Sequence, residues 1–326
     1  MPSPTEPNDP PATAPASRRA LGSEGTVIRV DARQCEVLRD HEESPRPAQM
    51  RGRLWEANTE DKSPVAVGDR VHLEHEEDGD AISEVLPRRN EFSRRAAGED
   101  PRRQLLAANV DQIVLVSCFG TPPFSSLTTD RILASASFAG ISALVVLNKI
   151  DKAKPNKIDK IAATYQRVGI SLLLTSAETG EGCQALADAL KDKVSVLYGL
   201  SGVGKSSLLN RVEDGLGLRT REVSESLKSG RHTTTFARLY PLEVGGAVID
   251  TPGARTFRPW GIPPHELRLH YPEMAMVGRD CRFPACLHRD EPDCAVLAAA
   301  ERDEIAASRM RSYHELLAEL QSVYGS

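Results

Sequence analysis

The hydrophobic positions of this 326-residue chain form short runs separated by polar loops. Between residues 22 and 86, five such runs have the short length and partial alternation of apolar and polar side chains that are typical of β-strands. The runs are TVIRV (26–30), QCEVL (34–38), GRLWE (52–56), DRVHL (69–73) and AISEVL (81–86). Five short strands predict a small β-barrel, with an OB-fold as the leading form and an SH3-like barrel as the alternative.

Four later runs are almost continuously apolar, and each ends at a polar or glycine-containing loop. They are ALVVL (143–147), LLLT (172–175), VSVLY (194–198) and GGAVI (245–249). Such short apolar runs are typical of β-strands, and each one stands directly before a candidate motif. After residue 294, apolar residues recur with helical spacing among charges, which predicts a helix or a pair of helices at the C-terminus.

The loop after VSVLY matches a phosphate-binding pattern. Gly199, Gly204, Lys205 and Ser206 satisfy G-x-x-x-x-G-K-[ST]. Backbone N–H groups of such a loop face phosphate oxygens, the lysine reaches the β- and γ-phosphates, and the serine hydroxyl binds Mg²⁺. The alternative is a tight turn with a solvated lysine. The predicted phosphate-binding residues are Gly199, Leu200, Ser201, Gly202, Val203, Gly204, Lys205, Ser206 and Ser207.

Two further loops favour guanine as the base. NKID follows ALVVL, and its Asp151 carboxylate can accept hydrogen bonds from guanine N1–H and the exocyclic amine, a pattern that adenine lacks. The TSA sequence after LLLT would place a backbone N–H near guanine O6. Either motif alone is also compatible with an ordinary polar loop. The predicted base-binding residues are Asn148, Lys149, Ile150, Asp151, Ser176 and Ala177.

The remaining nucleotide motifs bear on Mg²⁺ and the γ-phosphate. DTPG (250–253) follows GGAVI, so Asp250 is predicted to hold Mg²⁺ through water and the Gly253 amide to meet the γ-phosphate. A plain Asp-Pro-Gly turn is the alternative. GRHTTT (230–235) resembles a first switch in which Thr234 closes over Mg²⁺, although Thr233 and Thr235 are also candidates.

The residue that positions the attacking water is not the usual one. Ras-like enzymes carry glutamine just after the DxxG element, whereas this chain has Ala254, which cannot orient water. His232 is the nearest candidate, because imidazole can position or deprotonate water near neutral pH. A solvated histidine or an RNA contact is the alternative. The predicted catalytic residues are His232, Thr234 and Lys205.

A second group of residues has the spacing of a metal site. Cys281, Cys286, His288 and Cys294 follow the pattern C-x₄-C-x-H-x₅-C. Three thiolates and one imidazole predict a closed tetrahedral zinc site, which would be structural because no position is left for water. Buried free cysteines with a surface histidine are the alternative.

Charge is unevenly distributed along the chain. The formal net charge is −5, which argues against a uniform electrostatic attraction to RNA. Basic residues are concentrated in the stretch after the predicted barrel, where either an RNA contact or a solvated linker is expected. They are Arg88, Arg89, Arg94, Arg95, Arg102 and Arg103. A further group surrounds the predicted zinc ligands, namely Arg279, Arg282 and Arg289.

The termini and the remaining cysteines indicate a cytoplasmic protein. Residues 1–21 are rich in proline, alanine and serine, which predicts a disordered tail and neither a signal peptide nor an anchor. The sequence contains no run of eighteen apolar residues. Cys35, Cys118 and Cys183 are scattered, as expected for free thiols in a reducing compartment.

The order of the motifs is unusual, because the base-reading loops precede the phosphate-reading ones. The chain therefore resembles a circularly permuted GTPase. With the barrel, GRHTTT and the cysteine-histidine pattern, it resembles from about residue 22 to its end the small ribosomal subunit biogenesis GTPase family of bacteria. Two differences stand out: this family usually has a bulkier apolar residue at the position of Ala254 and often serine at that of Thr251.

The resemblance implies a fold and a function. The expected architecture is multidomain α/β, with a tail (1–21), an OB-fold-like RNA-binding barrel and basic linker (22–101), a circularly permuted Ras-like P-loop GTPase domain (102–259) and a zinc-binding domain with a C-terminal helix (260–326). The implied activity is hydrolysis of GTP to GDP during late maturation of the 30S subunit. One structural Zn²⁺, Mg²⁺ with GTP, the 30S subunit and its 16S rRNA are expected, with no membrane or DNA partner and a monomeric state.

Two other functions remain open at this point. A GTP-gated RNA-binding regulator with a different RNA target would carry the same motifs. A nucleotide-sensing scaffold with little hydrolysis is the other, because Ala254 cannot position water.

Overall fold

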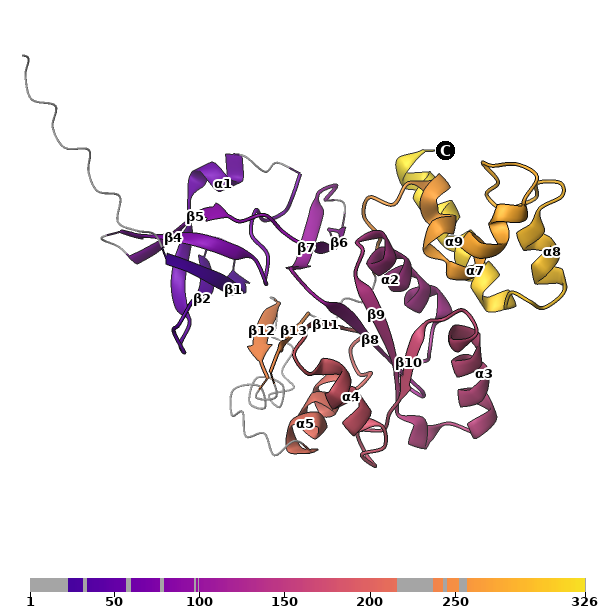
Figure 1. Ribbon diagram of the computed structural model, residues 1–326, viewed down its shortest axis with the longest axis horizontal. Coiled ribbons are helices and arrows are strands. Elements are labelled where there is room, and N and C mark those ends of the chain that lie inside the picture. The colour runs from indigo at the N-terminus through magenta and orange to yellow at the C-terminus, as the bar shows by residue number, and fades with distance from the viewer. Residues whose placement is uncertain are drawn as a thin grey trace, which may run out of the picture.

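A computed structural model describes residues 23–31, 34–56, 60–76, 79–96, 98, 100–215, 237–242, 245–251 and 257–325 (Figure 1). A β-barrel lies at one end, an α/β layer in the centre and a helical module at the other end (Figure 1). The predicted tail and the predicted first switch lie outside the described residues.

The barrel consists of five strands in the order β1-β2-β3-β5-β4, and pairing of β1 with β4 closes it. The strands are β1 (Ser23–Asp31), β2 (Gln34–Arg39), β3 (Arg46–Met50), β4 (Arg70–Glu76) and β5 (Gly79–Val85). β3 and β5 are parallel, and the other pairs are antiparallel. Its interior is filled by aliphatic side chains such as Val27, Val71 and Ile82. The prediction of an OB-like barrel is confirmed.

One of the five predicted strands is wrong. GRLWE forms the helix α1 (Gly52–Glu56), and the third strand is the preceding segment RPAQM. In this segment only Ala48 and Met50 point inward, and Pro47 weakens its strand pattern. α1 packs its partly buried Leu54 and Trp55 against the barrel core, so its apolar residues are used without strand pairing.

The central sheet contains five parallel strands in the order β10-β9-β8-β11-β13, with β12 antiparallel at its edge. The strands are β8 (Gln112–Cys118), β9 (Ser142–Asn148), β10 (Ser171–Leu174), β11 (Val194–Tyr198), β12 (Arg238–Pro241) and β13 (Ala247–Asp250). The helices are α2 (Ser126–Phe138), η1 (Ile150–Lys152), α3 (Pro155–Gln166), α4 (Cys183–Leu190) and α5 (Lys205–Gly215). Each of the four later runs predicted as a strand forms one, so this part of the prediction is confirmed, and the structure shows that these strands are parallel.

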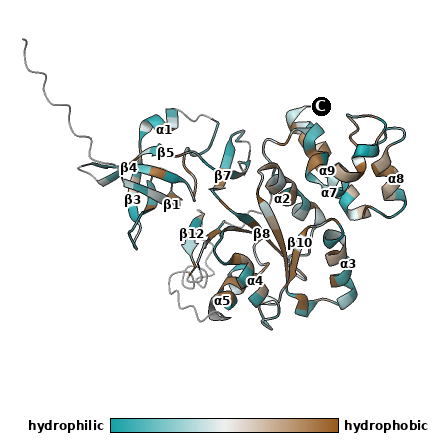
Figure 2. Ribbon diagram, viewed as in Figure 1, coloured by the Kyte–Doolittle hydropathy of each residue, from teal (hydrophilic) through white to brown (hydrophobic). Residues whose placement is uncertain are grey.

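Both faces of this sheet are covered by helices. Along β8, Ile113 and Leu115 face one core with residues of α2, whereas Val114 and Val116 face the other core with residues of α4 and α5. This period of two explains why the strand is apolar throughout. The hydrophobic colour in Figure 2 accordingly concentrates on β8 and its neighbours.

A separate hairpin lies between the barrel and the helical module (Figure 1). It is formed by β6 (Glu91–Arg95) and β7 (Arg103–Ala108), so it crosses the domain boundary that we expected at residues 101 and 102. Among the described residues, one strand pairing joins the barrel to the central sheet, that of Arg29 with Arg238. The hairpin therefore provides an additional connection between the two units.

The basic stretch around this hairpin is largely used inside the protein. Four of its six arginines form ion pairs, namely Arg88–Asp69, Arg89–Asp111, Arg102–Asp100 and Arg103–Asp61. Asp69 and Asp61 are buried, and Glu91 accepts hydrogen bonds from both Arg88 and Arg103. A solvated linker is thus the wrong interpretation for Arg88 and Arg103, because their side chains hold the hairpin to the barrel.

The C-terminal module is helical, and the predicted helix pair is confirmed. Its elements are η2 (Pro264–His270), α7 (Pro272–Val277), η3 (Gly278–Asp280), α8 (Ala295–Glu301) and α9 (Ala307–Tyr324). One hydrophobic core joins them to Ala134 of α2. In the part of the chain that the structure describes, no helix has both the length and the apolar character needed to cross a membrane.

A buried arginine joins α9 to the central domain. Arg309 is only 2% exposed, donates to both oxygens of Glu273 (2.6 and 3.1 Å) and also bonds to Asp130 of α2. Its guanidinium lies 4.5 Å from the ring centre of Tyr271. The Ser312 hydroxyl donates to the second oxygen of Asp130. A charge this deeply buried is tolerable only because both carboxylates compensate it.

Replacing Arg309 with alanine should therefore lower the free energy of unfolding strongly, by about 3–5 kcal/mol, because two buried carboxylates lose their counter-ion. Urea unfolding followed by circular dichroism would measure the change. Arg302→Ala is the matched control, because Arg302 pairs with Glu304 on the surface and its loss should leave stability near that of the wild type. Equal stability of the two variants would contradict the assignment.

Candidate functional site

Four of the predicted nucleotide motifs meet at one edge of the central sheet. NKID, TSA, the glycine loop and DTPG begin where β9, β10, β11 and β13 end, and these strands are parallel. The carboxyl ends of parallel strands share an edge, which is where open α/β sheets bind ligands. Segments up to about a hundred residues apart in sequence are thereby brought together.

The glycine loop is closely packed beneath its neighbours. A Cβ atom at Gly204, whose φ is +98°, would lie 2.4 Å from Nδ2 of Asn148, and one at Gly199 would lie 2.3 Å from the carbonyl oxygen of Val116. α5 begins at Lys205, so its free N–H groups face the loop. The Lys205 ammonium donates to the carbonyl oxygen of Gly199 at 2.8 Å. The geometry is that of a phosphate-binding loop followed by a helix N-terminus.

Asn148 connects three of the loops. Its Nδ2 donates to the carbonyl oxygen of Val203 at 2.9 Å. Its Oδ1 accepts from the backbone N–H of Ala177 at 3.2 Å and from the Thr175 hydroxyl at 3.4 Å. Asn148 is buried, so these hydrogen bonds are shielded from water. Asn148, a predicted base-binding residue, thus also fixes the NKID and TSA loops relative to the glycine loop.

Lys149 and Asp151 are the other two side chains of NKID that are predicted to bind the base. Lys149 adopts φ +60°, and its ammonium donates to the carbonyl oxygens of Gly202 and Thr121. The Asp151 carboxylate accepts from the Ser176 hydroxyl at 2.6 Å and is otherwise exposed. NKID and TSA therefore act as one unit, with the carboxylate available to a ligand.

Asp250 and Lys205 form the charged part of the site. Burial raises the pKa of Asp250 to about 6, although the Lys205 ammonium acts in the opposite direction. Burial likewise lowers the pKa of Lys205, which Asp250 opposes. Oδ1 of Asp250 is buried and has no hydrogen-bond partner among the described residues. Such an uncompensated carboxylate oxygen fits a hydrated Mg²⁺, which prefers oxygen ligands and retains water.

Some predicted site residues lie outside the described residues. They are His232, Thr234 and Gly253, with Thr233, Thr235 and Ala254. The strand before DTPG is described as far as Thr251, whose hydroxyl donates to the carbonyl oxygen of Leu197 at 3.1 Å. This bond ties the start of DTPG to the strand that enters the glycine loop.

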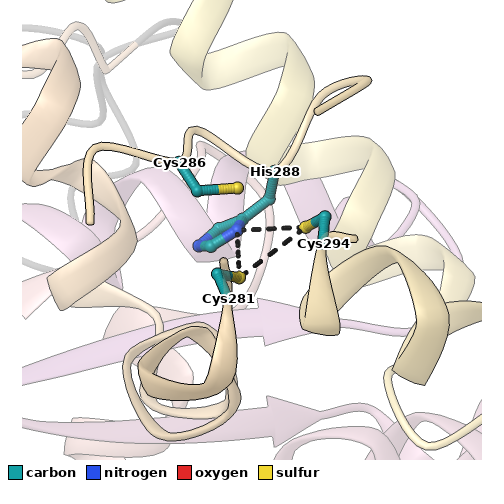
Figure 3. Close-up of side chains that lie close together, drawn as sticks. All are labelled: Cys281, Cys286, His288 and Cys294. Carbon is teal, nitrogen blue, oxygen red and sulfur yellow. Dashed lines mark hydrogen bonds between the residues drawn. The ribbon is translucent and has the colours of Figure 1, made fainter. Parts of the chain in front are cut away.

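The cysteine-histidine group is assembled as a compact cluster (Figure 3). The four side-chain ligand atoms of Cys281, Cys286, His288 and Cys294 lie within 4.8 Å of one another. Nδ1 of His288 is 3.6 Å from Sγ of Cys281 and 3.4 Å from Sγ of Cys294, and these two sulfurs are 3.8 Å apart. A tetrahedral zinc with Zn–S bonds of about 2.3 Å implies sulfur separations of about 3.8 Å. The residues fit a metal ion of this size.

Local structure holds these ligands in place. His288 has a φ of +58°, and a Cβ atom at Gly278 would come within 3.1 Å of its ring. The carbonyl oxygen of His288 accepts from Nε2 of His314 at 2.7 Å. Burial raises the pKa of Cys286 to about 12 and lowers that of His288 to about 4. Burial also raises the pKa of Cys294. The thiols of Cys286 and Cys294 would therefore stay neutral without a cation, whereas binding of a metal ion would remove their protons.

Comparison with known proteins places this chain in a family. A family model described as RsgA GTPase matches residues 85–260, more than half of the chain. The chain belongs to the RsgA GTPase family. A relative from Gemmatimonas aurantiaca named small ribosomal subunit biogenesis GTPase RsgA is 40% identical over 84% of this chain and 90% of its own length. One of the same name from Flavobacterium johnsoniae is 36% identical over 82% and 85%.

Solved structures agree with the assignment to the RsgA family. YjeQ from Thermotoga maritima is 32% identical, with a TM-score of 0.69 over 92% of this chain and 99% of its own. YloQ, described as a circularly permuted GTPase, is 28% identical, with a TM-score of 0.67 over 95% and 98%. This RsgA family member is thus a GTPase with a circularly permuted GTPase fold, as its motif order predicts.

One feature of this RsgA family member was not predicted from sequence. Phe92, Tyr198 and Phe257 form an aromatic cluster, in which Phe92 and Phe257 are stacked at 5.6 Å and Tyr198 meets Phe257 edge-on at 5.4 Å. Phe92 belongs to the hairpin, Tyr198 directly precedes the glycine loop, and Phe257 follows DTPG by four residues. No local pattern marks residues this far apart, so only the fold reveals the cluster.

Asp151 is predicted to read the guanine base, and this prediction implies a change of nucleotide specificity on mutation. Asp151→Asn should weaken GTP binding by about 3 kcal/mol or more, because an amide cannot accept both hydrogen bonds from guanine. It should favour xanthosine triphosphate, which carries a carbonyl in place of the amine. Titration of both nucleotides would measure this. Asp159→Asn, an exposed change on α3, should bind GTP as the wild type does. Unchanged GTP affinity of Asp151→Asn would contradict the role.

The cysteine cluster predicts that metal removal destabilises the C-terminal module. Cys281→Ser should reduce the zinc content from about one ion per chain to nearly none, because three remaining ligands bind much more weakly. Mass spectrometry of the native protein would measure the metal, and near-UV circular dichroism would follow the packing around Tyr313. Cys183→Ala is the control, because Cys183 is a buried residue of α4 that packs in a hydrophobic core and is not part of the cysteine-histidine cluster. Full zinc occupancy of Cys281→Ser would refute the ligand set.

Proposed function

We propose that this protein hydrolyses GTP to GDP and phosphate and acts in late maturation of the 30S ribosomal subunit. The observation that carries the proposal is the convergence of NKID, TSA, the glycine loop and DTPG at one sheet edge, in a chain of the RsgA GTPase family. Relatives that share most of its length are named small ribosomal subunit biogenesis GTPases. The proposed substrate, reaction and partner follow from these two facts.

The side chains predicted for the nucleotide site have the following proposed roles in binding. Asp151 reads the guanine, Lys149 covers the base with its aliphatic stem, and the backbone of residues 199–204 cradles the phosphates. Lys205 leaves the carbonyl of Gly199 to contact the β- and γ-phosphates. Mg²⁺ would neutralise charge that develops on the phosphates, held by Ser206, by Thr234 and, through water, by Asp250.

The proposed hydrolytic step uses residues of the two switches. We assign the positioning of water to His232, since Ala254 has no group that can do so. The Gly253 amide would meet the γ-phosphate. Lys205 stabilises negative charge on the transferring phosphoryl group, and this electrostatic contribution is the main way proteins accelerate such reactions.

The surroundings of the site support coupling between GTP and the flanking domains. The chain that leaves DTPG packs Phe257 onto Phe92 of the hairpin, and the backbone N–H of Arg95 donates to the carbonyl oxygen of Arg258 at 2.9 Å. The same chain then enters the C-terminal module. A change at Gly253 on loss of the γ-phosphate would therefore act on both flanks of the central domain.

Cellular and structural assignments complete the proposal. The 16S rRNA is the proposed contact of the barrel, and one structural Zn²⁺ is proposed for the cysteine cluster. We propose a cytoplasmic monomer without a membrane or DNA partner. We also propose the domain division as tail (1–21), barrel and linker (22–101), GTPase domain (102–259) and zinc domain (260–326).

Turnover of GTP by the full-length, zinc-loaded protein tests the proposal. The isolated protein should turn over at roughly 10⁻⁴ to 10⁻³ s⁻¹, because unassisted small GTPases are slow, and a partner can accelerate them by up to about 10⁵-fold. Added 30S subunits should accelerate release of phosphate, whereas 50S subunits and ATP should not substitute. Rapid turnover that ignores 30S subunits would refute the proposal, and stimulation by another RNA alone would favour a different RNA target.

The role of His232 is tested in the same assay. His232→Ala should lower the 30S-stimulated rate by about 10²-fold or more, because general base or water-positioning groups contribute about 10²–10⁴-fold. GTP affinity should stay the same. His265→Ala is the control, since His265 is an exposed histidine of η2. An unchanged stimulated rate in His232→Ala would remove this residue from the mechanism without affecting nucleotide binding.

A further inference from the structure

The lysines of this chain are strongly concentrated beside the base-reading loop. The chain contains ten lysines, and five of them occur within residues 149–160. Lys149 belongs to the nucleotide site. The other four are exposed and begin one residue after Asp151. We call this group the lysine patch, and its members are Lys152, Lys154, Lys157 and Lys160.

The lysine patch does not help the local fold. Lys154 is the N-cap residue of α3 and makes no capping hydrogen bond with its side chain, and the described first turn of the helix contains no acidic residue. Cations are unfavourable at a helix N-terminus, and like charges three residues apart, as in Lys157 and Lys160, repel each other. α3 is anchored through its opposite face, where Tyr165 and Ala162 are buried. Its positive charge thus opposes helix formation.

The patch is also not neutralised within the protein. Every salt bridge between described residues has arginine or histidine as its cation, and none involves a member of the lysine patch. Four of the six arginines around the hairpin, by contrast, are paired with carboxylates. The lysine patch therefore carries four exposed positive charges, close together in the chain, that form no salt bridge with any described residue.

We propose that the lysine patch docks on the phosphate backbone of RNA. This inference rests on the proposed function, because the RNA would be that of the 30S subunit. Lysine contributes a mobile point charge that suits phosphate without reading sequence. On a chain with a net charge of −5, such a local patch is what orients binding to a polyanion.

The lysine patch adjoins the base-reading loops, so RNA bound to the patch would also affect the nucleotide site. Lys152 lies in η1, whose backbone N–H bonds to the carbonyl oxygen of Lys149 at 3.0 Å, and Ile150 donates to the carbonyl oxygen of Thr175. The patch and both base-reading loops are thus one hydrogen-bonded unit. RNA bound at the start of α3 would hold the guanine end of the pocket directly against the subunit.

Salt-dependent binding to 30S subunits tests the inference with the full-length, zinc-loaded protein. Changing all four patch lysines to glutamine should reduce the slope of log affinity against log salt concentration by about 3, because each lost phosphate contact lowers it by roughly 0.7–0.9. Affinity should fall about tenfold or more. The control carries Lys62→Gln, Lys191→Gln and Lys193→Gln, which are exposed lysines elsewhere, and should change less than about twofold. An arginine version of the patch should retain binding.

The outcomes of this binding experiment distinguish a failure of the inference from a failure of the proposed function. Equal slopes for the glutamine variant and the wild type would overturn the inference while leaving the proposed function intact. A parallel loss of GTP affinity would also overturn it, because the defect would then lie in the nucleotide pocket. Weakened binding to 30S but not to deproteinised 16S rRNA would indicate a ribosomal protein instead. If the wild type itself bound neither particle nor rRNA, the proposed function would fail, and the inference with it.

Discussion

The aromatic cluster is the contact on which the arrangement of this protein depends. Phe92 comes from the hairpin beside the barrel, Tyr198 from the strand that enters the glycine loop, and Phe257 from the chain that leads to the C-terminal module. All three side chains are buried. Stacked and edge-on rings have preferred geometries, so a shift of one ring displaces the others. Through this cluster, the hairpin and the segment that leads to the C-terminal module are fixed relative to the strand that enters the glycine loop.

Arginine and lysine serve different purposes in this chain. Arg88, Arg103 and Arg309 hold elements together, because a planar guanidinium forms two parallel hydrogen bonds with a carboxylate and tolerates burial. The four lysines of the lysine patch remain at the surface, where an ammonium on a flexible stem keeps its hydration. The net charge of −5 therefore hides two populations of positive charge, one structural and one available to partners.

The circular permutation alters how the site is connected while preserving the site itself. The strand ends that carry NKID, TSA, the glycine loop and DTPG meet because the sheet is parallel, regardless of their order along the chain. The permutation changes which element follows DTPG: the chain now passes Phe257 and enters the C-terminal module. Asn148 has to bridge to the glycine loop across more than fifty residues, and its buried amide does so with hydrogen bonds.

The sequence by itself determined the features that local spacing encodes. The glycine loop, NKID and the cysteine-histidine cluster could be recognised because their chemistry requires particular residues within a few positions of one another. Only the tertiary structure decided that RPAQM, and not GRLWE, completes the barrel, since strand identity depends on which partner is available for pairing. It also decided that Arg88 and Arg103 face carboxylates, and that Phe92, Tyr198 and Phe257 meet. Such contacts join residues far apart in the chain, and no periodicity or spacing records them.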